Sequence, residues 1–268
     1  MKIDLLKSNL TQVQKITFAG VFISLIIILQ KVLAINYIPV VPFLRISLGG
    51  CALLIFASIL LGPWYGLLIG VAEDLLGYLI FDPKSMSFFP QITAIYGLMG
   101  FVSYFIFMLV RQIKNKKIMF SIEIATFVGI LTAVTLFLCL NDELTLYSAT
   151  YQIENWQRIT IPCVLFALLT LLTICIIFTE RYFKRRKDSQ LFNAYQVSFA
   201  CFIIEVTVMI MFGTLMKGFA FGFQTYPVIF ISQLIVGFIN IPLNTFLISY
   251  IMIFAKMKFN VQDETQNS

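Results

Sequence analysis

The chain contains no histidine, and only 12% of its 268 residues are charged. Without histidine it lacks the commonest general base and metal ligand, so neither a Ser-His nor a Cys-His pair can form. It also lacks the phosphate-binding pattern G-x-x-x-x-G-K-S/T and a dinucleotide fingerprint. We therefore predict that the chain is not an enzyme, that it does not hydrolyse ATP on its own, and that it holds neither a metal ion nor another cofactor.

Apolar residues make up 60% of the chain, against about 45–50% in soluble domains. Several runs exceed the roughly 18 apolar residues of a membrane-spanning helix, and none alternates like the strands of a β-barrel. The five cysteines all lie in apolar runs without metal-ligand spacing, which predicts neither disulfides nor a zinc site. The pattern predicts an all-α polytopic membrane bundle of eight spans, near residues 16–35, 46–62, 64–81, 90–110, 119–140, 161–180, 194–216 and 227–255.

The 19 lysines and arginines are distributed unevenly among the segments that join these spans. With an inner N-terminus, the inner segments carry Lys2, Lys7, Lys15, Arg111, Lys114, Lys116, Lys117, Arg181, Lys184, Arg185, Arg186, Lys187, Lys256 and Lys258. The outer segments carry only Lys31, Arg45, Lys84, Arg158 and Lys217. This bias obeys the positive-inside rule and predicts a cell-membrane protein with both termini cytoplasmic. A nucleic-acid-binding surface would also explain the net charge of +6, but the distribution favours membrane topology.

The third predicted span carries two adjacent carboxylates, Glu73 and Asp74, at a depth where ionisable groups are costly and usually functional. Gly66, Gly70 and Gly77 share a helical face with Glu73, and Asp74 lies at the edge of that face. A stripe of small residues lets another helix backbone approach closely. We predict that this helix lies inside the bundle and that its outer end helps to form a ligand site.

Other residues allow two interpretations each. The small pair Gly20 and Ser24 on the first span permits tight packing, either within the bundle or against a partner. Arg45 before the second span is either an interfacial anchor or a ligand contact. Phe88 and Phe89 before Pro90 are either interfacial aromatics or a stacking wall for a flat ring.

The last two predicted spans contain further buried polar residues. Glu205 lies near the centre of the seventh span, as either an interhelical hydrogen-bond partner or a ligand group. Gln233, Gly237, Asn240 and Asn244 share one face of the eighth span, which favours a wall facing a ligand or partner. Pro242, between the two asparagines, should kink this helix or free a carbonyl.

Residues 16–112 and 194–255 resemble the folate-family S components of energy-coupling-factor (ECF) vitamin transporters. The resemblance is carried by LRISLGG (44–50), LLGPWYGLLIGVAEDLLGYLIF (60–81), FFP (88–90), FGTLMKGF (212–219) and IPLNTFLISYI (241–251). It implies a fold of six helices, in residues 1–118 and 194–268, with residues 119–193 as an inserted two-helix hairpin and its basic inner loop. We interpret this hairpin as a peripheral, lipid-facing addition.

The resemblance also implies a function. An S component binds a vitamin outside the cell and docks with a transmembrane coupling protein and two ATPase subunits for uptake. The family's small-xxx-small contact with the coupling protein matches Gly20 and Ser24, its arginine matches Arg45, its acidic position matches Asp74, and its Phe-Pro matches Phe89 and Pro90.

For folate we expect the outer loops 36–45, 82–90 and 217–226 to close over the pterin ring. Stacking would come from Phe88, Phe89, Phe221 or Phe223, and the glutamate tail would meet Arg45 or Lys217. The pterin edge would meet Glu205, Gln233 or Asn240. Three alternatives remain open: another vitamin or precursor, a proton-coupled carrier that uses Glu73, Asp74 and Glu205, and a scaffold role.

Overall fold

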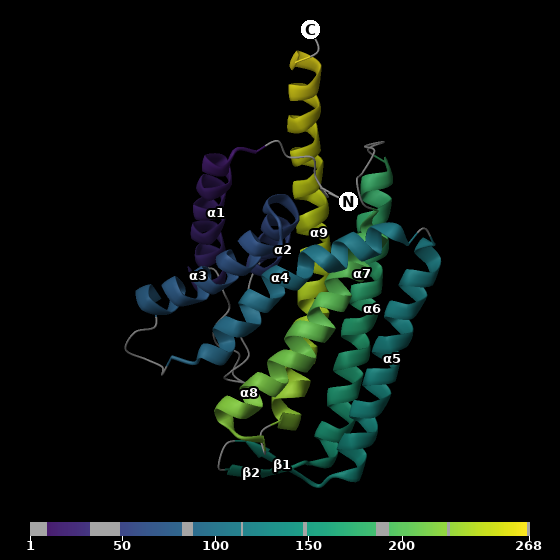
Figure 1. Ribbon diagram of the computed structural model, residues 1–268. Coiled ribbons are helices and arrows are strands. Elements are labelled where there is room, and N and C mark those ends of the chain that lie inside the picture. Colours follow the sequence, from purple (N-terminus) through teal and green to yellow (C-terminus); the bar gives the residue numbers. More distant parts are fainter. Residues whose placement is uncertain are drawn as a thin grey trace.

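A computed structural model describes residues 10–32, 49–81, 88–113, 115–146, 149–185, 193–223 and 226–266. They form a bundle of helices with one antiparallel pair of short strands at one end (Figure 1). In chain order the elements are α1 (Gln12–Ile27), η1 (Ile28–Val32), α2 (Gly50–Leu61), α3 (Pro63–Phe81), α4 (Pro90–Gln112), α5 (Lys116–Leu140), β1 (Glu143–Leu146), β2 (Ala149–Gln152), α6 (Asn155–Arg185), α7 (Ala194–Ile204), η2 (Glu205–Phe212), α8 (Gly213–Phe221) and α9 (Tyr226–Gln266). The segments η1 and η2 are π-helical turns that continue α1 and α7.

Seven helices of the described chain are long and apolar enough to cross a membrane, and α2 is the exception. Its 12 residues extend about 18 Å, short of the roughly 30 Å hydrocarbon core. All of its residues except Leu53 and Leu60 are buried, and it contacts α1, α3, α4 and α9. Within the described residues, the predicted span near 46–62 is thus represented by the short helix of residues 50–61 in the centre of the bundle.

Two glycines flank α2, one before its first residue and one after its last. Gly62 has φ +100° between α2 and α3, a conformation that side-chain-bearing residues rarely adopt, and Pro63 starts the next helix. Gly49 has φ +88° before α2, and a Cβ there would lie 2.4 Å from Leu247 Cδ1 of α9. The start of α2 is thereby packed directly against the last helix.

The glycine stripe of α3 packs against α4, as the sequence predicts. A Cβ at Gly66 would lie 2.4 Å from the carbonyl oxygen of Gly100, and one at Gly70 would lie 2.3 Å from that of Tyr96. Such distances leave no room for a side chain at either position. Glycine at 66 and 70 therefore lets the backbone of α3 approach that of α4 directly. Gly77 differs, since the aliphatic part of Lys31 from η1 covers it.

The hairpin of α5 and α6 lies along one edge of the bundle (Figure 1), but it is more than a lipid-facing addition. Its inner face packs on α7 and α9, with the Phe127 ring 5.0 Å from Phe202 and 4.6 Å from Phe238. The Ser198 hydroxyl of α7 donates to the buried Glu123 carboxylate of α5 at 2.9 Å. The outer face of the hairpin stays exposed, as expected for a peripheral element. Its inner face, in contrast, is part of the packed bundle.

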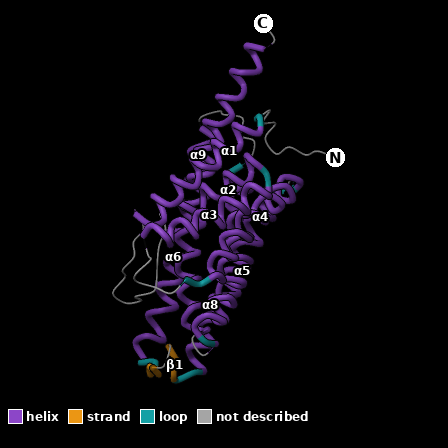
Figure 2. Tube along the Cα trace, turned by 60° about the vertical axis from the view of Figure 1, so that its left-hand side comes forward, coloured by secondary structure: helices purple, strands orange, loops and turns teal. Residues whose placement is uncertain are grey.

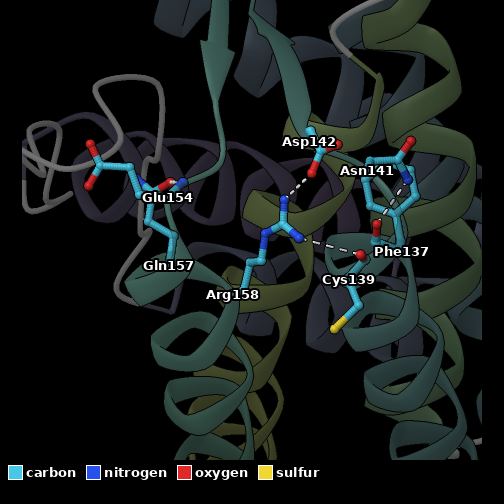
Figure 3. A network of polar contacts seen from close by, with 7 residues as sticks. All are labelled: Phe137, Cys139, Asn141, Asp142, Glu154, Gln157 and Arg158. Atoms are coloured by element: carbon cyan, nitrogen blue, oxygen red, sulfur yellow. Dashed lines mark hydrogen bonds and ion pairs between the residues drawn. The ribbon is translucent and has the colours of Figure 1, made fainter.

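Strands β1 and β2 join α5 to α6 at the end of the bundle opposite the C-terminus (Figure 2). Arg158 pairs with Asp142 and also donates to the Cys139 carbonyl at 3.5 Å (Figure 3). Asn141 Nδ2 donates to the Phe137 carbonyl at 2.9 Å, which closes the end of α5. This network fixes the strand pair on the ends of the two helices.

Candidate substrate-binding site

Glu205 is the first residue of the π-helical segment η2 and is almost completely buried. Wide π-helical turns are rare and occur frequently at functional sites. The Asn240 amide of α9 donates to Glu205 Oε1 at 3.3 Å. A Cβ at Gly237, one turn before Asn240, would lie 3.3 Å from Glu205 Cγ. The glycine therefore provides the space in which the Glu205 side chain lies against α9.

Further polar groups lie on α8, which continues the η2 segment, and on Asn240 itself. Lys217 of α8 is partly buried and interacts electrostatically with Glu205. Thr214, also on α8, is fully buried, and its hydroxyl has no hydrogen-bond partner among the described residues. The same is true of Asn240 Oδ1, the second polar atom of the amide that holds Glu205. Buried groups without partners are expensive, so each of these two atoms is a candidate contact for a polar ligand.

The eighth predicted span, within α9, carries its polar face toward the bundle. Gly237, Asn240 and Asn244 are buried, and Gln233 is partly buried. Both Gly237 and Asn240 contact Glu205, so part of this face serves contacts between helices. The helix α9 continues through Pro242 to Gln266.

Asp74 and Glu73 belong to a second group, in the C-terminal half of α3. The Thr93 hydroxyl of α4 donates to Asp74 Oδ2 at 2.5 Å, while Glu73 is buried. Lys31 lies over Gly77, about one helical turn beyond these carboxylates. A cation from the end of the first helix is thereby brought to the acidic face of the third.

Aromatic residues at the start of α4 extend this second group. The Phe88 ring lies 5.2 Å from Tyr78 of α3 in a tilted arrangement, and 40% of Phe88 is exposed. Phe89 precedes Pro90, is partly buried and is the N-cap residue of α4. A flat ligand at this end of the bundle would have aromatic surface available from Tyr78 and Phe88.

The two groups lie on different sides of α4. Thr93 faces α3 through Asp74, whereas the Ile95 side chain lies 3.8 Å from a Cβ built on Gly213 of α8. Two residues turn a helix by about 200°, so these directions are nearly opposite. The arrangement does not bring Asp74 and Glu205 together as one acidic cluster.

Several predicted site residues lie outside the described residues. These are Arg45, the loop 36–45, and residues 82–87 of the loop 82–90. Residues 224–225 of the loop 217–226 are also outside, and so is the side chain of Phe221. The described part of the 217–226 segment includes Phe223, whose exposed ring lies 4.9 Å from that of Phe219.

The first-helix pair Gly20 and Ser24 lies on an exposed face of α1. A Cβ on Gly20 would meet nothing within 4 Å, and Val13, Ile16 and Val21 are exposed around the pair. Packing within the bundle therefore does not explain the small residues in the described structure. This face is therefore available for contact with membrane lipid or with a partner protein.

Sequence reasoning missed Lys31 and Thr93. Lys31 was predicted only as an outer charge, although a cation within an apolar span is itself a functional signal. Thr93 carries no such signal, because threonines that bond to their own helix are common in this chain, as at Thr126 and Thr132.

Comparison with known families identifies the class of protein. The family model for the ECF transporter, substrate-specific component, matches residues 14–180, and the chain belongs to this family. It is thus a multi-pass membrane protein that serves as the substrate-binding subunit of an ECF transporter, and it is not an enzyme. The family implies a small-molecule substrate and an ECF module of coupling protein and ATPases. The searches of curated proteins and of solved structures found no match.

Proposed function

We propose that this protein captures a vitamin, folate or a related pterin, at the outer face of the cell membrane. The family match over residues 14–180 carries the class of function. The choice of folate rests on the resemblance of residues 44–50, 60–81, 88–90, 212–219 and 241–251 to the folate-family subunits.

The chemistry around Glu205 and Asn240 suits the edge of a pterin. Such a ring presents N–H donors beside ring nitrogen acceptors. Asn240 Oδ1 accepts and the Thr214 hydroxyl donates, and both atoms are buried without partners in the described structure. A ligand that hydrogen-bonds to either atom would remove a cost of about 1–3 kcal/mol for that buried group. Lys217 and Arg45 remain our candidates for the carboxylates of the glutamate tail, with Gln233 as a further edge contact.

Aromatic surface supports the same proposal. The rings of Phe88 and Tyr78 are adjacent where α3 ends and α4 begins, and Phe89 follows Phe88 in the chain. Stacking of a ring on such a pair contributes about 0.5–1.5 kcal/mol beyond area burial. Asp74, held by Thr93, would then accept from a donor of the ligand. In this proposal, residues 1–118 and 194–268 supply the site, and residues 119–193 are an inserted hairpin.

The exposed face of α1 around Gly20 and Ser24 is our candidate for the contact with the coupling protein. Its small residues allow a partner helix to approach the backbone closely. Both termini are proposed to be cytoplasmic, so that the substrate enters from the end that carries β1 and β2.

The experiment that tests the substrate is mass spectrometry of small molecules that copurify with the full chain, followed by titration of the stripped protein with folate. We expect a pterin in the extract and saturable folate binding. A different vitamin in the extract would overturn folate while leaving the transporter class intact.

A proton-coupled carrier remains the second candidate, because Glu73 and Glu205 are buried at membrane depth. Uptake into proteoliposomes separates the two functions. The ECF function requires the coupling protein and ATP, whereas a carrier would take up substrate alone under a proton gradient.

A further inference from the structure

Three helix ends meet around the first turn of α7, at the end of the bundle opposite the strands (Figure 1). The Gln196 amide of α7 donates to the carbonyl of Ile113, just beyond α4, at 3.3 Å. Glu180 of α6 accepts from the backbone N–H of Ala194 at 3.0 Å. The Phe120 ring of α5 lies 5.2 Å from that of Tyr195. These contacts fix the ends of α4, α5 and α6 relative to one another.

Each of the three ends carries an exposed cation close to its contact with α7. Arg111 lies two residues before Ile113, Lys117 three residues before Phe120, and Arg181 directly after Glu180. Arg181 is also close enough to Tyr195 to interact with it electrostatically. The described residues provide no ion pair to any of the three cations. Among the described residues, the acids Glu180 and Glu123 near these contacts are both engaged with α7, through Ala194 and Ser198.

The residue types around these three cations are those typical of the level of the lipid headgroups. Tyr182 and Tyr195 are partly buried beside it, and tyrosines concentrate where hydrocarbon meets headgroups. Arg and Lys side chains extend from such positions toward the polar layer while their aliphatic stems stay on apolar surface. A fixed group of cations at headgroup depth attracts phosphates of anionic lipids, at about 1 kcal/mol for each charge.

We propose that Arg111, Lys117 and Arg181 form a binding site for the headgroup phosphate of an anionic phospholipid. The site depends on the α5–α6 hairpin, since two of its three cations belong to that hairpin. The hairpin thus gives the subunit a lipid contact that the other helices do not provide. The proposal rests on the fold and does not depend on the identity of the vitamin or on the orientation in the membrane.

Native mass spectrometry of the purified full chain tests this proposal, with phosphatidylglycerol and phosphatidylcholine of identical acyl chains as probes. We expect the wild type to retain phosphatidylglycerol preferentially. The triple variant Arg111→Gln, Lys117→Gln, Arg181→Gln should weaken that retention about fivefold for each cation removed. A matched control, Lys2→Gln, Lys7→Gln, Lys15→Gln, removes the same charge near the N-terminus and should retain the preference.

Melting temperatures of both triple variants check that each is folded, and single substitutions serve if the triple variant is not. Equal retention of the two lipids by the wild type would overturn the proposal, and so would equal losses in the test and control variants. If the test variant keeps its lipid but no longer binds the coupling protein, the cations belong to a protein interface and the proposal is likewise wrong.

Discussion

Glu205 is held by one hydrogen bond from Asn240 and by the space above Gly237. Glu205→Gln keeps an acceptor for the Asn240 amide and nearly the same volume. Glu205→Ala leaves the amide unpaired and opens a cavity. We expect the alanine variant to lose about 1–3 kcal/mol from the lost partner alone, and the glutamine variant to lose much less. Thermal unfolding in detergent measures both. Equal losses would mean that the charge of Glu205, facing Lys217, matters more than the hydrogen bond.

Thr93 positions Asp74 through a hydroxyl that donates at 2.5 Å. Thr93→Val removes this donor with little change of shape, whereas Thr93→Ser keeps it. If Asp74 contacts the vitamin, the valine variant should bind folate about tenfold more weakly, since hydrogen bonds to charged groups contribute about 1.5–3 kcal/mol. Calorimetric titration of both variants gives the comparison. Unchanged affinity in Thr93→Val would remove Asp74 from the proposed site.

Single residues were predictable from sequence where their chemistry was unusual for their depth. Glu73 and Glu205 stood out as carboxylates within apolar runs, and the structure buries both. The partners of Glu205 and of Asp74, the residue next to Glu73, were less accessible. Thr93 and Asn240 reach their carboxylates from other helices, and a sequence does not give the rotation of one helix against the next.

Helices α3 and α4 meet backbone to backbone at Gly66 and Gly100. A methyl group at Gly66 would lie 2.4 Å from the Gly100 carbonyl oxygen, so Gly66→Ala must push the helices apart and loosen the packing beneath Asp74 and Thr93. Overpacking of this kind costs typically about 1–3 kcal/mol. Gly129→Ala is the matched control, because nothing lies within 4 Å of a Cβ there. Since alanine favours helix over glycine, melting temperatures should fall for Gly66→Ala and stay level or rise for Gly129→Ala.

The exposed face of α1 allows a test of the proposed docking surface for the coupling protein. Gly20→Leu adds a large side chain where the described structure leaves open space, so the fold and vitamin binding should persist. Docking through this face should fail, because the coupling protein could no longer approach the backbone. Folate binding to the purified subunit, compared with ATP-driven uptake in the reconstituted transporter, separates the two effects. Normal uptake by Gly20→Leu would place the docking surface elsewhere.

Most helices could be predicted from hydropathy, because a run of about 20 apolar residues in lipid has few stable conformations other than a helix. The glycine contact of α3 with α4 was also predictable. Four-residue spacing places the glycines on one helical face, and the same arrangement allows the close approach of the two helices. The short α2 and the π-helical segments η1 and η2 were not predictable. A short buried helix and a full span have the same composition, and one extra residue in a turn leaves no mark on periodicity.

In the whole molecule, the α5–α6 hairpin leaves the contacts among the other helices direct. Helix α4 contacts α7 directly, and α2 contacts α9, while the main contacts of α5 and α6 are with α7, α9 and each other. The family match covers residues 14–180, which includes α5 and most of α6, while α7 and α9 beyond it pack against α4 and α2. That residues 119–193 are an insertion into a fold completed by residues 194–268 stays a proposal.

The same architecture makes a prediction about orientation. Helix α1 begins at the end of the bundle where α9 finishes, and the strand pair lies at the other end (Figures 1 and 2). Because most cations flank the first of these ends, the positive-inside rule places it in the cytoplasm. Cysteines introduced at Glu143 and Glu154, in a variant without the five native cysteines, should react with an impermeant maleimide on intact cells. Cysteines at Lys117 and Arg181 should react only after permeabilisation. The reverse pattern would invert the protein in the membrane and move the proposed vitamin site to the cytoplasmic side, where capture from outside is impossible.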